Sequence, residues 1–206
     1  MHKQASSKNI SVAQVMKLML ATNILVLSFA VPVAAGSLED GRAAYEHRDF
    51  AIAERLFRPL AEHGNAIAQY NLGVMYYKGE GVPQSYPHAV SWYRYAAWQG
   101  DASAQLELGL MCYNGQGTLQ NYAEALTWFR KAADQGSARA QFNLGAMYAN
   151  GQGVPQDYIL AHMWLSLAAA KNETRAVDLR DIVAAKMTAA QVAEAQKLAR
   201  EWKPTK

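Results

Sequence analysis

The apolar residues between positions 66 and 98 form two successive stripes with helical spacing. Ala68, Leu72 and Tyr76 lie four residues apart, which places them on one face of a helix. The second stripe has spacings of three or four residues and comprises Ala89, either Trp92 or Tyr93, and Ala96. Between the stripes lies the sequence GEGVPQSY, whose glycines and proline are typical of a turn. The segment therefore predicts two helices joined by a tight loop.

This two-helix pattern occurs three times along the chain. The loop sequences GEGVPQSY, GQGTLQNY and GQGVPQDY begin at residues 79, 115 and 151, so the period is 36 residues. A fixed period of this length is typical of a solenoid, in which each unit buries its apolar face against its neighbours. Several residues flanking the loops keep the same period: Ala68-Gln69, Ala104-Gln105 and Ala140-Gln141; Leu72-Gly73, Leu108-Gly109 and Leu144-Gly145; Trp92, Trp128 and Trp164; Ala96-Ala97, Ala132-Ala133 and Ala168-Ala169.

The two glycines of each loop could belong to a phosphate-binding loop or to a chain reversal. A dinucleotide-binding loop needs a third glycine after a strand, and a P-loop ends in lysine followed by serine or threonine. These features are missing here, so we expect the glycines to adopt positive φ in a turn between helices. Ser85, Asn121 and Asp157 share one repeat position just before the second helix, where we expect them to act as N-caps.

The repeat reads AxAQxxLGxxYxxGxGVxxD followed by AxxWYxxAAxxG, and this pattern resembles Sel1-like repeats, which are relatives of the tetratricopeptide repeat. The resemblance covers three units, at 66–101, 102–137 and 138–172. It implies an all-α fold, an α/α solenoid of helical hairpins that serves as a scaffold or adaptor.

The segments on either side are expected to complete the solenoid. In 37–65, Gly41, Ala53 and Phe57 have the spacing of a plain tetratricopeptide repeat, without the longer loop of the Sel1-like units. The segment 173–202 leaves the 36-residue period and predicts a terminal pair of capping helices. Thr188 and Gln191 have the spacing of a capping box at the start of the second of these helices.

Residues 1–35 have the pattern of a secretory signal peptide. Three lysines and no acidic residue come first, an uncharged apolar run follows, and Val33-Ala34-Ala35 has the small residues of a cleavage site. Cleavage after Ala35 would place the protein in the periplasm or outside the cell. Met16 is an alternative start, because it would give a signal of more ordinary length. If the segment is retained, it could instead anchor the protein in the inner membrane.

The charge of the mature chain argues against two classes of partner. The sequence pI of 8.9 suggests a basic protein. Without the three lysines of the signal, however, the 20 basic residues fall to the number of the acidic ones, 17. A neutral chain offers no basic surface for nucleic acid or for an anionic membrane. The single cysteine, Cys112, excludes an internal disulfide framework.

No motif in the sequence indicates catalysis, a cofactor or a metal. His47, His63, His88 and His162 lack the i,i+4 spacing of a helical metal site, and HExxH, CxxC and GxSxG do not occur. Cys112 stands where Tyr76 and Tyr148 stand in the other units, so we expect a buried thiol. Trp92, Trp128 and Trp164 are expected to be core residues, because they recur with the period.

The family resemblance leaves an enzymatic alternative, a hydrolase directed at the cell wall or at β-lactams. Some secreted Sel1-like proteins have a disulfide in every unit, and this chain lacks those cysteines. We therefore predict a scaffold without catalytic activity.

By the resemblance to tetratricopeptide units, a protein or peptide partner would bind the concave surface lined by the first helix of each pair. The exposed residues there are expected to be apolar and aromatic, which suits an apolar partner segment, either extended or helical. Alternatively, superhelical curvature or the terminal helices could bury part of this surface. The predicted partner-binding residues are Ile67, Tyr70, Val74, Tyr77, Lys78, Leu106, Leu110, Tyr113, Asn114, Arg139, Phe142 and Asn150.

Overall fold

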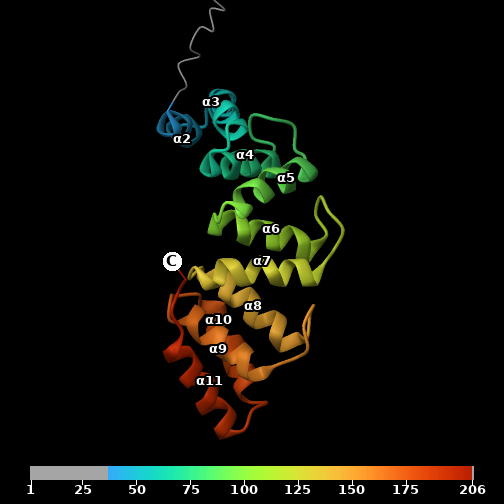
Figure 1. Cartoon of the computed structure of the whole chain (residues 1–206), viewed down its shortest axis with the longest axis vertical. Helices are drawn as coiled ribbons and strands as arrows, with labels where there is room; N and C mark the ends of the chain where they lie inside the picture. The colour runs from blue at the N-terminus through green and yellow to red at the C-terminus, as the bar shows by residue number, and fades with distance from the viewer. Residues whose placement is uncertain (1–36, 206) are drawn as a thin grey trace, which may run out of the picture. The chain divides into compact units, whose positions relative to one another are not determined.

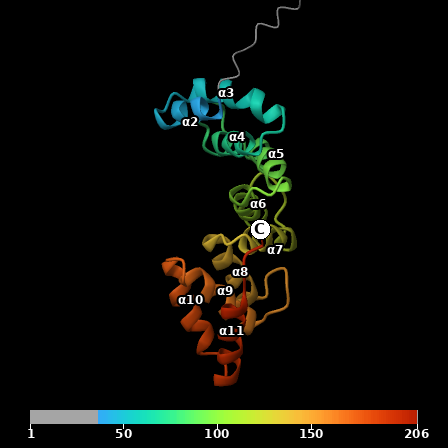
Figure 2. The same ribbon diagram turned by 60° about the vertical axis from the view of Figure 1, so that its left-hand side comes forward.

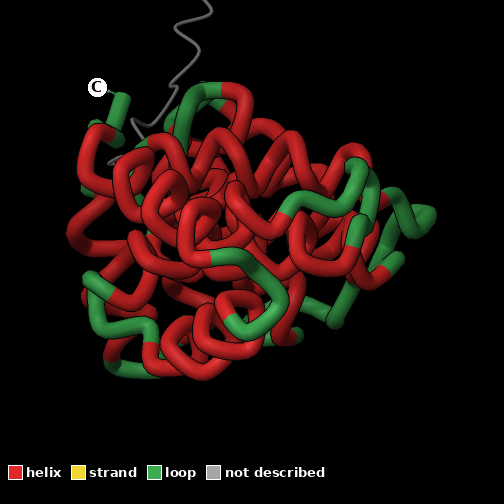
Figure 3. Tube along the Cα trace, turned by 90° about the horizontal axis from the view of Figure 1, so that it is seen from below, coloured by secondary structure: helices red, strands yellow, loops and turns green. Residues whose placement is uncertain are grey.

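The computed structural model describes residues 37–205, and every regular element in that range is an α-helix (Figure 3). The predicted signal peptide and its cleavage site at Ala35 lie outside the described residues. The expected all-α architecture is confirmed. Among the described helices, none combines the length and the apolar composition that a membrane span requires.

The helices form four consecutive hairpins, in which each helix packs against the next one along the chain, and two terminal helices follow (Figures 1 and 2). In the last three hairpins a long loop joins the two helices, as the glycine-containing sequences predict. The four hairpins are α2 Leu38–Glu46 with α3 Phe50–Glu62, α4 Ala66–Lys78 with α5 Tyr86–Trp98, α6 Ala102–Asn114 with α7 Tyr122–Asp134, and α8 Ala138–Asn150 with α9 Tyr158–Ala169. The terminal helices α10 Thr174–Ala184 and α11 Ala189–Glu201 both pack against α9.

All three predicted residues occupy the N-cap position, but only two of them form the expected side-chain bond. The side chains of Asn121 and Asp157 accept hydrogen bonds from backbone N–H groups three residues later, at 3.0 and 2.9 Å. Ser85 makes no such bond, because its hydroxyl instead pairs with Nδ1 of His88 at 2.7 Å. At the C-terminal end, Thr188 and Gln191 form the expected capping box.

The recurring Leu-Gly pairs are the points where the two helices of a hairpin touch. A Cβ atom on Gly73 would lie 2.5 Å from the ring of Tyr93. At Gly109 the corresponding distance to the ring of Phe129 would be 2.7 Å. Glycine is therefore required there by close packing. It also follows that Tyr93, and not Trp92, is the residue of α5 that faces the partner helix.

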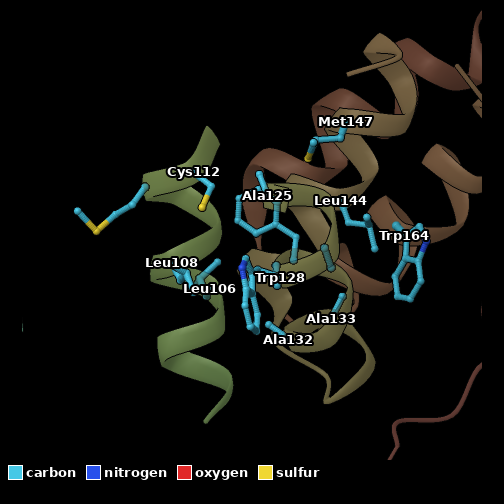
Figure 4. Close-up of a cluster of buried hydrophobic side chains, with 14 of the residues drawn as sticks. Leu106, Leu108, Cys112, Ala125, Trp128, Ala132, Ala133, Leu144, Met147 and Trp164 are labelled. Carbon is cyan, nitrogen blue, oxygen red and sulfur yellow. The ribbon is translucent and has the colours of Figure 1, made fainter. Parts of the chain in front are cut away.

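The buried apolar residues form two clusters, and the larger one, which runs from α5 to α10, includes Leu108, Cys112, Leu144 and Trp164 (Figure 4). Cys112 is fully buried, as expected from its place in the repeat. Trp128 and Trp164 are also buried, so their predicted core role is confirmed. The prediction is wrong for Trp92, which is only half-buried because Tyr93 takes the inward position on α5.

Candidate interaction site

The glycine loops hold neighbouring hairpins together. Both glycines of each loop have positive φ, between 67° and 76°, as predicted for a turn. The second glycine also lies against the backbone of the preceding hairpin. A Cβ on Gly117 would come within 2.4 Å of the carbonyl carbon of Tyr86, and one on Gly153 within 2.6 Å of that of Tyr122. The loop is therefore packed against the start of the preceding hairpin's second helix.

The predicted partner-binding residues lie on α4, α6 and α8, and we call the surface of these three helices the first-helix face. Leu106 is only 6% exposed, so it offers almost no surface to a partner. Its side chain joins the core, where the α-helical register turns it away from solvent. Of the other predicted residues, Ile67, Lys78, Asn114, Arg139 and Asn150 are exposed, and Tyr70, Val74, Tyr77, Leu110, Tyr113 and Phe142 are half-buried.

Part of the first-helix face is hollowed between α6 and α8. The pocket has a volume of about 240 Å³, and four predicted residues line it together with amide side chains and no charged group. The hydroxyl of Tyr113 donates a hydrogen bond to Oε1 of Gln152 at 3.1 Å, which fixes one wall. The lining comprises Leu110, Tyr113, Asn114, Phe129, Phe142, Asn143, Ala146, Met147 and Gln152.

Charged groups on this face are largely engaged with one another. Glu107 and Arg139 approach to 3.5 Å. Burial raises the pKa of the Glu107 carboxyl, and the Arg139 guanidinium opposes that rise. The Arg175 guanidinium lies 4.5 Å from the ring centroid of Phe142, so the first terminal helix covers part of this aromatic surface.

Cys112 stands at a repeat position where the flanking units have a tyrosine that contacts an arginine. Arg58 donates a hydrogen bond to the hydroxyl of Tyr76 at 3.0 Å, and an equivalent bond links Arg130 to Tyr148. The central unit has Cys112 at this position, and Arg94 pairs instead with Glu124 at 3.0 Å.

Burial raises the pKa of the Cys112 thiol to about 11, so the group is protonated near neutral pH. A protonated, buried thiol is a poor nucleophile. Its environment is that of a core residue.

The four histidines within residues 37–205 belong to four different helices or their C-caps. His162 is buried, and desolvation lowers its pKa, so burial favours the neutral ring. His88 is exposed and stacks on Tyr76 with a centroid distance of 5.0 Å. Across residues 37–205, no three histidine, cysteine, aspartate or glutamate side chains come close enough to hold a metal ion.

Sequence reasoning missed the role of the recurring glutamines. Each is buried and uses its side-chain amide to donate a hydrogen bond to a carbonyl near the end of the preceding hairpin. The signal in the sequence was the repeated Ala-Gln pair. Its 36-residue period alone does not reveal what the glutamine side chain binds. The three bonds are Gln69 to Ala61 at 2.9 Å, Gln105 to Ala97 at 3.1 Å, and Gln141 to Ala133 at 3.2 Å.

The comparison with protein families finds three Sel1 repeats, at residues 66–101, 102–137 and 138–173. Two solved structures are similar to the chain. One is a protective antigen present in uropathogenic Escherichia coli strains that displays an SLR fold, with 31% identity and a TM-score of 0.71. The other is a Sel1 repeat protein from Oxalobacter formigenes, with 31% identity and a TM-score of 0.68. None of the curated proteins compared matches the chain.

The two similar structures differ in length from this chain. The match to the antigen covers 93% of this chain but only 41% of the antigen. The match to the Oxalobacter formigenes protein covers 85% of this chain and 78% of that protein.

Proposed function

The chain belongs to the Sel1 repeat family, and from this membership we propose that it is an exported adaptor that binds a protein partner through its first-helix face. Sel1 repeat proteins generally mediate protein–protein interaction. The observation that carries the proposal is the uncharged pocket between α6 and α8. It brings together Leu110 and Tyr113 from one hairpin and Phe142 from the next.

The pocket favours an apolar anchor from a polypeptide over a small-molecule ligand. Its volume of about 240 Å³ is below the roughly 300–1,000 Å³ of typical small-molecule sites. The lining has aromatic and aliphatic side chains, which suit one apolar side chain of a partner. The amides of Asn114 and Asn143 lie at the same pocket and can hydrogen-bond to the backbone of that partner.

We propose that this role involves no catalysis. Three titratable side chains of the first-helix face, those of Glu107, Tyr113 and Arg139, are engaged with neighbouring side chains. Tyr113 donates to Gln152, and Arg139 pairs with Glu107. General acid–base chemistry needs a group that is free to exchange a proton with a substrate. The Sel1 repeat fold is typically a non-catalytic scaffold.

Replacing both Tyr70 and Phe142 with alanine is expected to weaken partner binding at least tenfold, because each loses an aromatic contact surface. The partner would first be identified by cross-linking in cells, and its affinity for the purified protein would then be measured. The matched control replaces the exposed Leu119 and Ile182 with alanine. Equal affinity of the aromatic double variant and the control, with unchanged helicity in both, would contradict this binding site.

Export rests on the sequence of residues 1–35. We expect the mature protein to begin at Gly36, because the signal pattern ends with small residues before that position. The intact mass of protein purified from the cell envelope or the medium tests this. A mass that includes the first 35 residues would contradict cleavage and favour a retained anchor.

A further inference from the structure

Two hollows one repeat apart lie on the edge where the second helices end. The α5 hollow is lined by Ala61, Glu62, Gln69, Trp92 and Tyr95 and measures about 360 Å³. The α7 hollow measures about 330 Å³ and is lined by Gly100, Gln105, Lys131, Asp134, Gln135 and Thr205. Gln69 and Tyr95 precede Gln105 and Lys131 by 36 residues, so the hollows occupy equivalent positions in successive units.

The C-terminal tail of the chain forms part of the α7 hollow. The backbone N–H of Thr205 donates a hydrogen bond to the carbonyl of Asp134, the last residue of α7, at 2.8 Å. Trp202 begins this tail with φ −65° and ψ 138°, close to polyproline II, and Lys203 and Pro204 follow. Figures 1 and 2 both place the C-terminal end beside α7. The edge thus already holds an extended, proline-containing segment.

Two contacts anchor the tail in this position. The ring of Trp202 packs edge-on against Trp164, with centroids 6.1 Å apart. The ammonium group of Lys171 lies 5.6 Å from the centroid of the Trp202 ring. The tail is therefore held by the ring of Trp202 and the backbone of Thr205, while Lys203 and Pro204 between them are exposed.

Within residues 37–205 no such segment occupies the α5 hollow, which Trp92 and Tyr95 line, and the adjoining Trp98 lines a neighbouring hollow. Tyr95 lies 5.9 Å from Trp92 and 6.2 Å from Trp98 between ring centroids, and both pairs meet edge-to-face. Tyr95 and Trp98 are 51% and 64% exposed. The equivalent residues are Lys131 and Asp134 on α7, so the fold does not require aromatic side chains there. Exposed tryptophan and tyrosine clusters are typical of binding surfaces.

We propose that the α5 hollow binds an extended, proline-containing segment of a partner protein with a basic residue next to the proline. Such segments adopt a polyproline II conformation and dock in grooves lined by aromatic side chains.

The polar groups of the α5 hollow complement this ligand. Glu62 is exposed and forms no ion pair within residues 37–205, so its carboxylate is available to the basic residue. Trp98 ends α5 as Asp134 ends α7. Its carbonyl is therefore placed to accept the backbone hydrogen bond that the Asp134 carbonyl receives from Thr205.

A labelled peptide of Lys-Pro-Thr repeated four times tests the proposal by fluorescence anisotropy with the purified protein. We expect saturable binding that Tyr95→Lys or Trp98→Asp weakens at least tenfold. These substitutions introduce the residues that α7 carries, so the fold should tolerate them. Leu119→Ala, at an exposed apolar position elsewhere, is expected to leave the affinity unchanged.

Further measurements separate the contributions of charge and of proline. Glu62→Gln is expected to weaken binding severalfold and to reduce its dependence on salt. Peptides with glutamate for lysine, or with alanine for proline, are expected to bind more weakly. The variant with Tyr70 and Phe142 replaced should bind the peptide normally, so this test is independent of the first-helix face.

Three results would overturn the proposal. One is the absence of saturation up to about 1 mM peptide. Another is equal affinity in the wild type and in both α5 variants. The third is binding of a soluble polysaccharide, lost in the same variants, in the absence of peptide binding, since this would identify these aromatic residues as a carbohydrate site.

Discussion

Replacing Gly153 with alanine is expected to lower the free energy of unfolding by about 2–4 kcal/mol. The residue has φ +69°, which is strained for any side chain. In addition, the new Cβ would lie 2.6 Å from the carbonyl carbon of Tyr122 and would force the loop away from the preceding hairpin. Chemical unfolding followed by far-UV circular dichroism measures the loss.

Gly151 in the same loop is the matched control for this substitution. Its φ is +67°, but an added Cβ would make only ordinary contacts, the nearest at 3.4 Å from Gln156. Gly151→Ala should therefore cost only the backbone strain, about 1–2 kcal/mol. If both variants lose the same stability, the second glycine is not a packing contact between hairpins, and its recurrence needs another explanation.

Replacing Leu108 with alanine is expected to lower the free energy of unfolding by about 2–5 kcal/mol. Leu108 is fully buried in the central unit, and its removal would leave a cavity between α6 and its neighbours. Differential scanning calorimetry measures the shift of the melting transition. Leu110→Ala is the matched control, because that leucine is half-buried and lines the pocket. An unshifted transition for Leu108→Ala would show that the core is assigned wrongly.

The position of Leu108 in the stack adds a second expectation to the same experiment. Each helix from α2 to α10 packs chiefly on the helices next to it in the chain, and α11 packs on α9. Loss of the central unit therefore separates the hairpins on either side, which retain their own neighbours. The Leu108→Ala variant should unfold over a broader range than the wild type, because the two sides no longer melt together.

The sequence predicted the helical hairpins because their signals are local. The 36-residue period and the helical spacing of Ala68, Leu72 and Ala89 identify the buried faces. The glycines of the loops were assigned to positive φ, and the structure confirms this. Buried helix faces and turn glycines depend on residues that are close together in the chain. The spacing of those residues is therefore visible in the sequence.

The wrong predictions concern residues whose contacts depend on packing or on a nearby side chain. Trp92 and Tyr93 both fit the periodic stripe of α5, and packing against Gly73 selects the tyrosine. The prediction for Ser85 failed because His88, three residues later, offers its hydroxyl a different partner. Leu106 was assigned to the partner-binding surface by the resemblance to tetratricopeptide units, whereas contacts with the core bury it. The spacing of residues in the sequence does not distinguish between such alternatives.

By itself, the sequence determined the all-α class, the hairpin period, the loops and most of the buried positions. Only the tertiary structure decided which residues meet across hairpins. It assembled the uncharged pocket from α6 and α8, and it brought Thr205 to the end of α7. The physical reason is that helix formation depends on residues within a turn or two, whereas these surfaces depend on how the hairpins pack. Packing joins residues as far apart as Asp134 and Thr205, and no local pattern records that contact.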